Sequence, residues 1–220
     1  MQKWYATEAL RIIGHQKGRD VKERQFRNFG SARPEGYRKS ARVMQLAEKL
    51  GFPVVSFIDT PAAESRLDAE ERGISNAIAE NMELMSCLRT PIVVVIIGEG
   101  GSGGAIGMAV GDHVMMLEHS IYSVIPPESC AVILNAFGRD ANRASEAAEA
   151  LRLAAKETMA LGAVDEIIPE PLGGAHRDPA AAAANVEKAI TRALTRLQAV
   201  PVDELVKARY AKLRGVRHYL

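Results

Sequence analysis

The stretch that decides the fold of this chain is Gly98-Glu99-Gly100-Gly101-Ser102-Gly103-Gly104-Ala105-Ile106-Gly107, in which six of ten residues are glycine. An unbroken apolar run from Ile92 to Ile97 precedes it, and a further apolar run from Met108 to Val110 follows it. This order predicts a buried strand, a tight turn and the start of a buried helix.

Two properties of this glycine-rich turn bear on function. Glycine is needed where φ is positive or where another group must approach the main chain closely. The first residues of a helix also present N–H groups that have no acceptor inside the helix, together with a partial positive charge. Such a turn can hold an anion, or an oxygen that becomes negative during a reaction. The alternative is a turn that uses glycine only to pack a helix against a sheet.

Length and composition predict a globular protein, with residues 1–220 as a single domain. Apolar residues make up 47%, and 28 basic residues balance 27 acidic ones. This balance excludes a strong field toward nucleic acid or an anionic membrane, so we expect neither as a partner. The first residues are charged and no apolar run is as long as a membrane span, so we expect a cytoplasmic protein.

The cysteines and the basic C-terminal segment receive ordinary structural interpretations. Cys87 and Cys130 fit no metal-ligand spacing, so we expect both to be small core residues and predict no metal in this chain. The segment Lys207–His218 holds five basic residues and no acidic one. We interpret it as a solvated helix face.

Strands and helices are expected to alternate along the chain. The expected strands are Val54–Ile58, Ile92–Ile97, His113–Leu117, Ile121–Ile125 and Val164–Ile168. Apart from the helix after the glycine-rich turn, the expected helices are residues 34–50, Ala69–Leu88, Pro127–Leu134, Ser145–Leu161, Pro179–Leu197 and a last helix from Asp203. This alternation predicts an α/β fold with a mainly parallel sheet.

Two of the expected strands end in turns that we expect to face each other. Asp59-Thr60-Pro61 follows the strand Val54–Ile58, and the glycine-rich stretch follows the next strand. Ligands in open α/β sheets bind at the carboxyl ends of strands. Backbone N–H groups from both turns would then form a two-donor oxyanion hole.

Several longer motifs have no generic structural explanation. In chain order they are His15-Gln16-Lys17-Gly18-Arg19, Arg27-Asn28-Phe29-Gly30, Pro34-Glu35-Gly36-Tyr37-Arg38-Lys39, Phe57-Ile58-Asp59-Thr60-Pro61, Ala69-Glu70-Glu71-Arg72-Gly73, Ile97-Gly98-Glu99-Gly100-Gly101-Ser102-Gly103-Gly104-Ala105 and Ile168-Pro169-Glu170-Pro171-Leu172-Gly173-Gly174-Ala175-His176-Arg177. Together they resemble the carboxyltransferase alpha subunit of bacterial acetyl-CoA carboxylase, and the resemblance covers about residues 12–214.

The resemblance implies an α/β fold of the crotonase-like type, a superhelix of ββα units, here with C-terminal helices. It implies an enzyme of alpha and beta subunits, usually two of each, with the active site between them. The beta subunit, a separate chain, would hold the acyl-CoA and carry a zinc finger. The alpha subunit would receive carboxybiotin from biotin carboxyl carrier protein. The product would be malonyl-CoA for fatty-acid synthesis, if the acyl-CoA is the family's usual acetyl-CoA rather than propionyl-CoA or a longer one.

The resemblance also implies which residues form the site. Main-chain N–H groups of Gly103, Gly104 and Ala105 would meet the biotin ureido oxygen, on which negative charge develops. The turn at Pro61 and Ala62 would supply the opposing wall. The further substrate-binding positions that it implies are Gly100, Gly101, Ser102 and Lys17.

One segment departs from the family pattern. Where the family reads Asp-Thr-Pro-Gly-Ala-Tyr-Pro-Gly, this chain has Asp59-Thr60-Pro61-Ala62-Ala63-Glu64-Ser65-Arg66. Alanine reaches a positive φ only with strain, so the change at Ala62 is expected to alter the wall. Pro126–Cys130 and Asn135 also depart from the pattern, and the part before Gly14 is shorter. The main alternative is therefore a non-catalytic structural or regulatory partner of a beta subunit.

A second alternative is a hydrolase that uses Ser102. Gly100 to Gly104 satisfies the Gly-x-Ser-x-Gly pattern of a nucleophile elbow. A serine nucleophile needs a base, and His15 and His176 are the candidates. We favour ordinary loop hydrogen bonding for both histidines.

Charged residues in these motifs suggest supporting roles. Glu99 is expected to orient the turn by accepting N–H bonds. The side chains of Lys17, Arg19, Arg38 and Lys39 are candidates for contact with CoA phosphates or with the beta subunit, and the sequence leaves both roles open.

Overall fold

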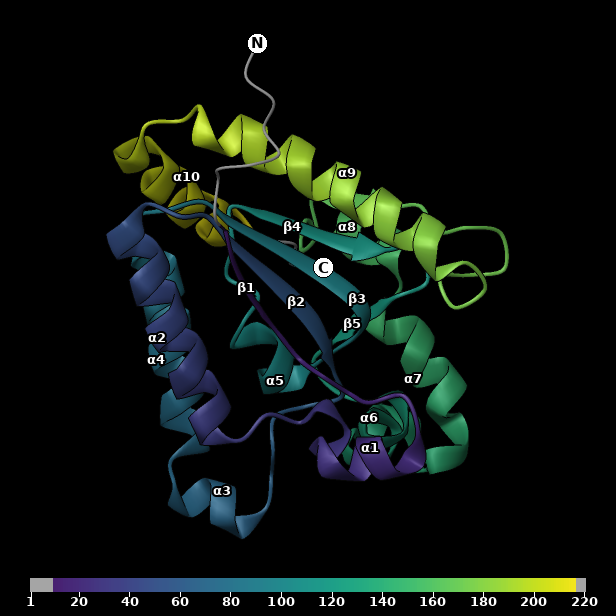
Figure 1. The fold of residues 1–220 in the computed structure, drawn as a ribbon. Helices are drawn as coiled ribbons and strands as arrows, with labels where there is room; N and C mark the ends of the chain where they lie inside the picture. The colour runs from purple at the N-terminus through teal and green to yellow at the C-terminus, as the bar shows by residue number, and fades with distance from the viewer. Residues whose placement is uncertain (1–9, 217–220) are drawn as a thin grey trace.

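The chain folds around one twisted parallel β-sheet with helices on both faces (Figure 1), and the computed structural model describes residues 10–216. The strands are β1 (Arg11–Gly14), β2 (Val54–Thr60), β3 (Ile92–Gly101), β4 (His113–Leu117), β5 (Ile121–Ser123) and β6 (Glu166–Ile168). The helices are α1 (Val21–Phe26), α2 (Pro34–Leu50), α3 (Leu67–Glu71), α4 (Ile74–Cys87), α5 (Ser102–Ile106), α6 (Pro127–Ile133), α7 (Ala144–Leu151), α8 (Ala155–Ala160), α9 (Pro179–Gln198) and α10 (Val202–Gly215), with short 3₁₀ turns η1 (Asn28–Gly30), η2 (Asn135–Phe137) and η3 (Ala141–Arg143).

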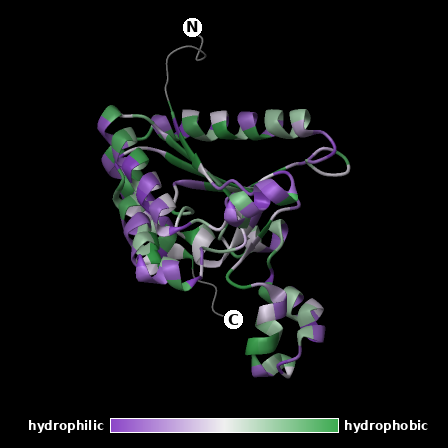
Figure 2. Cartoon of the chain, turned by 60° about the horizontal axis from the view of Figure 1, so that its bottom comes forward, coloured by the Kyte–Doolittle hydropathy of each residue, from purple (hydrophilic) through white to green (hydrophobic). Residues whose placement is uncertain are grey.

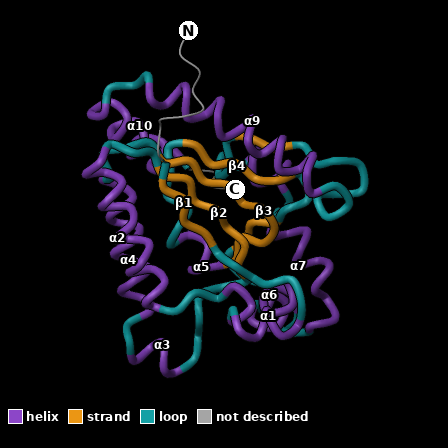
Figure 3. Tube along the Cα trace, in the orientation of Figure 1, coloured by secondary structure: helices purple, strands orange, loops and turns teal. Residues whose placement is uncertain are grey.

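The strand order is β1-β2-β3-β4-β6, and the pairs between these strands are parallel. Strand β3 changes partner along its length, because Val93 to Ile96 pair with β4 whereas Glu99 to Gly101 pair with β5. It therefore extends beyond the main sheet (Figure 3). The predicted parallel α/β architecture is confirmed.

Strand β3 is buried on both faces, and its residues alternate between two hydrophobic cores. Ile92, Val94 and Ile96 join the core that includes α2 and α4, whereas Val93 and Val95 join the core that includes α9. All five side chains have a relative exposure of 0%, and burial of each such side chain stabilises the fold by about 1.5–3 kcal/mol. The apolar run is thus typical of a strand that helices cover on both sides.

Helix α2 has well-defined signals at both ends. Pro34 occupies its first turn, where a missing N–H costs nothing, and Gly51 ends it with a φ of 68°. Tyr37, Met44 and Ala47 form its buried face. The predicted helix over residues 34–50 is confirmed.

The single helix predicted over Ala69–Leu88 is wrong. Gly73 takes a φ of 74° and separates α3 from α4. A left-handed residue cannot continue a right-handed helix, so the chain breaks there. The prediction that Cys87 is buried is also wrong, since it is exposed at the end of α4, whereas Cys130 is buried.

Two further elements differ from the sequence-based expectation. The helical region predicted over Ser145–Leu161 divides into α7 and α8, because Arg152 takes a φ of 49°. Strand β1 was not predicted, although Arg11 to Gly14 pair with β2 along their whole length. Four residues are too few to show a strand's period.

Helices α6 and α7 form a lobe that projects from the rest of the fold (Figure 2). The lobe has its own small core of Cys130, Ala131 and Ala147. On the opposite side of the molecule α9, 20 residues long, lies along the sheet. Within residues 10–216, neither α9 nor any other helix combines the length and apolar character needed to cross a membrane.

A buried arginine anchors α10 to the amino-terminal edge of the sheet. Arg209 Nη2 lies 2.8 Å from Asp112 Oδ2, and the two side chains are 0% and 3% exposed. The same guanidinium donates to the backbone oxygens of Met85, Leu88 and Thr90 at 2.7, 2.7 and 2.9 Å. The charge of Arg209 is therefore fully satisfied inside the protein.

The prediction that Lys207–His218 forms a solvated face is wrong in part. Lys207 is exposed, but Arg209 is buried and Lys212 pairs with Asp165. The end of this segment, from residue 217, lies outside the described residues.

Arg209→Met should lower the free energy of unfolding by about 3–5 kcal/mol, because it leaves the Asp112 carboxylate buried without its partner. Lys207→Met, on the exposed face of the same helix, should change it by less than about 0.5 kcal/mol. Urea unfolding followed by circular dichroism measures both. Equal effects of the two substitutions would contradict the anchoring role of Arg209.

Candidate functional site

The glycine-rich stretch forms the end of β3 and the start of α5. The predicted strand end at Ile97 is wrong, because β3 continues through Gly101 and pairs with β5 there. The turn itself lies at Ser102, which has a φ of 49° and begins α5.

The glycines of this stretch serve close approach rather than positive φ, since none of them has a positive φ. A Cβ on Gly101 would lie 1.8 Å from the carbonyl oxygen of Pro61, and one on Gly104 would lie 2.5 Å from the carbonyl carbon of Ala62. A side chain at either position would push the two turns apart. The turns after β2 and β3, which the sequence predicts to face each other, are therefore in contact.

Ala62 fits this wall without strain. It is not among the described residues with a positive φ, and Thr60 Oγ1 donates a hydrogen bond of 2.7 Å to its carbonyl oxygen. The expectation that alanine strains this position is wrong, because the turn does not need a left-handed residue there.

The predicted donors Gly103, Gly104 and Ala105 lie in the first turn of α5. N–H groups at the start of a helix have no acceptor within the helix. Within residues 10–216, none of these three N–H groups donates to a backbone carbonyl of another element. Gly104 and Ala105 are buried, whereas Gly103 is half-buried. An oxygen that enters from outside would therefore reach the Gly103 end of this turn first.

The opposite end of α5 is fixed by buried side chains that the sequence analysis missed. The Tyr37 hydroxyl donates to the carbonyl oxygen of Gly104 at 3.2 Å, and Asn81 Nδ2 donates to that of Gly107 at 2.7 Å. Burial raises the pKa of Tyr37, so its hydroxyl stays protonated and remains a donor. An asparagine on the otherwise apolar inner face of α4 was the available signal.

A charged cluster of Lys17, Asp59 and Glu99 links the carboxyl ends of β2 and β3 to the segment after β1. Lys17 Nζ lies 3.2 Å from Asp59 Oδ1 and 2.6 Å from Glu99 Oε2. Burial disfavours the charge on Lys17, but the hydrogen bond to Glu99 and the charge of Asp59 outweigh it, so the pKa of Lys17 lies above its ordinary value.

The role predicted for Glu99 is wrong. Its carboxylate accepts a hydrogen bond from Lys17 rather than from the turn, and its own N–H donates to Asp59 Oδ1 at 3.1 Å. Asp59 is thus the carboxylate that holds the backbone of β3.

Ser102 lines a cavity of about 220 Å³ with Tyr122, Arg152 and Thr158 among others. Its positive φ suits a nucleophile elbow, but a nucleophile also needs a base within hydrogen-bond reach. Within the part of the chain that the structure describes, neither ring nitrogen of His15 has a hydrogen-bond partner, so His15 does not pair with Ser102. His176 is exposed in the loop between β6 and α9. Nothing in this arrangement favours the hydrolase alternative.

The remaining candidate cations do not converge on the two turns. Arg38 Nη2 donates to the carbonyl oxygen of Arg72 at 2.8 Å, and Arg19 is exposed. Lys39 instead lines a second cavity, with His15. Within residues 10–216 no three His, Cys, Asp or Glu side chains gather in a group that could hold a metal ion.

The family model and the similar curated proteins point to the same family. Residues 4–217 match the family described as acetyl co-enzyme A carboxylase carboxyltransferase-like. The chain is 51% identical over 212 residues to a Geobacter metallireducens protein and 54% identical over 208 residues to one from Thioalkalivibrio sulfidiphilus, both named acetyl-coenzyme A carboxylase carboxyl transferase subunit alpha. The matches cover 96% and 94% of this chain but 66% and 64% of those proteins, so the chain spans about two thirds of their length.

Solved structures share the fold. Transcarboxylase 12S, determined with methylmalonyl-coenzyme A and methylmalonic acid bound, gives a TM-score of 0.67 at 21% identity, over 84% of this chain and 33% of that one. A Pseudomonas malonate decarboxylase hetero-dimer gives 0.70 at 14% identity, over 94% of this chain and 84% of that one. The expected crotonase-like fold is confirmed.

Gly104→Ala and Gly103→Ala test the contact between the turns. The first should lower the free energy of unfolding by about 1–3 kcal/mol, because its Cβ meets the Ala62 backbone at 2.5 Å. The second should be nearly neutral, because its Cβ comes no closer than 3.6 Å, to Ile78 Cδ1. Thermal melting compares the two, and equal stability would mean that the turns are not in backbone contact.

His15 should make stability depend on pH. Burial is the main cause that lowers its pKa from 6.5 to about 4, partly opposed by the charge of Asp59. Between these values the unfolded state binds a proton that the folded state does not, so the free energy of unfolding should rise with pH, by about 3 kcal/mol in total.

Urea unfolding of the unmodified chain and of His15→Leu across pH 4–7 measures this contribution. The variant should lack it, whereas His176→Leu, at an exposed histidine, should retain it. Parallel pH profiles for His15→Leu and the unmodified chain would show that His15 is not buried as a neutral ring.

Proposed function

The chain belongs to the acetyl co-enzyme A carboxylase carboxyltransferase-like family, and on this premise we propose that it is the alpha subunit of a biotin-dependent acyl-CoA carboxyltransferase. The proposed reaction moves a carboxyl group from carboxybiotin, carried on a separate protein, to acetyl-CoA and gives malonyl-CoA. The observation that carries the proposal is the backbone contact of Gly101 and Gly104 with Pro61 and Ala62, which fixes the N–H groups at the start of α5.

Oriented N–H groups suit this chemistry. Carboxybiotin supplies CO₂ when its N–CO₂ bond breaks, which leaves negative charge on the ureido oxygen. The N–H groups of Gly103, Gly104 and Ala105 would donate to that oxygen, and one such fixed donor is typically worth about 2.7–4 kcal/mol of barrier. The α-carbon of acetyl-CoA would give its proton to the same oxygen and form the new C–C bond to CO₂.

The residues present fit a neutral ring whose oxygen becomes negative. Gly103 is half-buried, and a Cβ there would have only Ile78 within ordinary contact distance, which leaves room for an entering group. The wall at Pro61 and Ala62 would exclude water from the oxygen.

The remaining substrate-binding positions would act from the same edge of the sheet. Gly100, Gly101 and Ser102 would line the approach with backbone. Lys17, held between two carboxylates, would keep the ends of β2 and β3 in register.

The proposal includes two protein partners. A zinc-finger beta subunit would hold the acyl-CoA, and biotin carboxyl carrier protein would present the carboxybiotin, in a cytoplasmic assembly of two alpha and two beta chains. In support, the similar curated proteins are named as subunit alpha, and the Pseudomonas malonate decarboxylase neighbour is a hetero-dimer.

The chain alone should show no carboxyl transfer, because it would supply only the biotin side of a two-chain site. Pure chain, carboxylated carrier protein and acetyl-CoA should give background, and addition of a cognate beta subunit should give malonyl-CoA. Radiolabelled carboxyl transfer measures both. A complex that assembles but transfers nothing would support the non-catalytic alternative and overturn the proposal.

Ser102→Ala should keep most of the activity of the assembled complex, because the proposed donors are backbone N–H groups. A loss above about a hundredfold with an unchanged melting temperature would instead assign a chemical role to the hydroxyl. Transfer rates and thermal melting on the same complex distinguish the two.

A further inference from the structure

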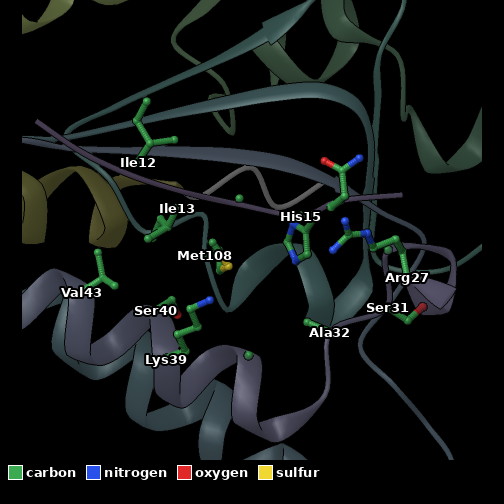
Figure 4. Close-up of a pocket in the computed structure, with 14 residues that line it drawn as sticks. Ile12, Ile13, His15, Arg27, Ser31, Ala32, Lys39, Ser40, Val43 and Met108 are labelled. Carbon is green, nitrogen blue, oxygen red and sulfur yellow. The ribbon is translucent and has the colours of Figure 1, made fainter. Parts of the chain in front are cut away.

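We propose that the cavity between β1 and α2 binds the phosphate group of a small phosphorylated molecule, through His15, Arg27 and Lys39. The cavity has a volume of about 390 Å³ and opens beside the face of β1 that α2 covers (Figure 4). None of the described residues that line it belongs to the two turns that carry the proposed carboxyl transfer. The residues that support this inference are therefore different from those that carry the proposed carboxyl transfer.

His15 is the first reason to expect a ligand. Both ring nitrogens are buried and have no hydrogen-bond partner among the described residues, although the backbone N–H of His15 donates to the carbonyl oxygen of Phe57 at 3.1 Å. An unsatisfied buried polar group costs about 1–3 kcal/mol, and most such groups in native proteins are paired. An acceptor oxygen of a ligand in the cavity would pair with the N–H of the imidazole.

The charges around the cavity select an anion. Arg27 and Lys39 both line it, and no Asp or Glu is among its described lining residues. The recorded ion pair of Arg27 is a long contact of 3.9 Å with Glu23, and within residues 10–216 Lys39 has none. In Figure 4 the guanidinium of Arg27 and the amine of Lys39 extend toward the cavity from two sides of His15.

A strained backbone turn holds Arg27 over the cavity. The two residues after it, Asn28 and Phe29, have φ values of 52° and 54°. Asparagine adopts this left-handed conformation readily, whereas for Phe29 it costs roughly 1–2 kcal/mol. The Asn28 side chain stabilises the turn by donating to the carbonyl oxygen of Ser31 at 2.9 Å. Strain of this kind gathers at ligand clamps, and both ends of this turn, Arg27 and Ser31, line the cavity.

The mixture of donors favours a phosphate over a simple carboxylate. A guanidinium fork, a point-charge ammonium and an imidazole can donate to different oxygens of a tetrahedral group. The apolar walls, which include Ile13, Val43 and Met108, leave room for an organic body. The phosphate can therefore come from free inorganic phosphate or from a phosphate of coenzyme A.

Titrations of the full chain followed by the NMR signal of the His15 ring test the proposal. Inorganic phosphate should shift this signal and raise the pKa of His15 above about 4, because a bound anion favours the charged ring. Coenzyme A, dephospho-coenzyme A and pantetheine separate the sources. Tighter binding of coenzyme A than of dephospho-coenzyme A assigns the 3′-phosphate, and binding of phosphate alone assigns the free ion. Binding of pantetheine equal to that of coenzyme A would overturn the proposal.

Variants with a matched control complete the test. Lys39→Met and Arg27→Met should each weaken phosphate binding at least about tenfold, and both side chains are exposed enough for the variants to fold. Lys49→Met, in the last turn of the same helix as Lys39, should leave binding unchanged.

His15→Leu should abolish binding and yet raise the melting temperature at neutral pH, because it removes two unsatisfied nitrogens. No shift of the His15 signal at millimolar phosphate, or equal effects of Lys39→Met and Lys49→Met, would overturn the proposal.

Discussion

The backbone contact between the turns after β2 and β3 is the constraint on which the rest of the site depends. Gly101 and Gly104 have no side chain because Pro61 and Ala62 occupy the space that a Cβ would need. Next to this contact, the register between β2 and β3 is irregular and shifts between Ile58 and Thr60. At this bulge the backbone N–H of Glu99 in β3 donates to the Asp59 side chain rather than to a backbone carbonyl. A bulge of this kind changes the direction of a strand where its pairing ends.

The hydrogen bonding of α5 is asymmetric, and the asymmetry has a chemical consequence. Tyr37 and Asn81 satisfy carbonyl oxygens of α5 and of the residue after it from the buried side. Within residues 10–216, no backbone carbonyl comparably accepts the first N–H groups of this helix. Fixed donors in a partly buried site need no reorganisation when charge develops on an oxygen, so they stabilise it more than water does.

Two side chains that can carry a positive charge illustrate opposite consequences of burial. Arg209 is fully buried, and Asp112 with three backbone oxygens accepts its hydrogen bonds, so it contributes to a fixed structure. The ring nitrogens of His15 are buried and have no hydrogen-bond partner within residues 10–216, and the pKa of His15 is lowered to about 4, chiefly because burial disfavours its charge. A fold retains an unpaired buried polar group most readily where a bound group offsets the free-energy cost of leaving it unpaired.

The sequence by itself determined the parallel α/β class, the double-sided burial of β3 and both ends of α2, because these follow from residues a few positions apart. The order of its strands and turns also predicted that the turns after β2 and β3 face each other. Only the tertiary structure showed that Gly101 and Gly104 are needed for close approach, that β1 joins the sheet, and that Arg209 is buried rather than solvated. Lys17 and Asp59 are 42 positions apart, and Arg209 and Asp112 are 97 apart. Close approach, ion pairing and burial depend on residues that are distant in the sequence, and the local periodicity of the sequence does not indicate which residues these are.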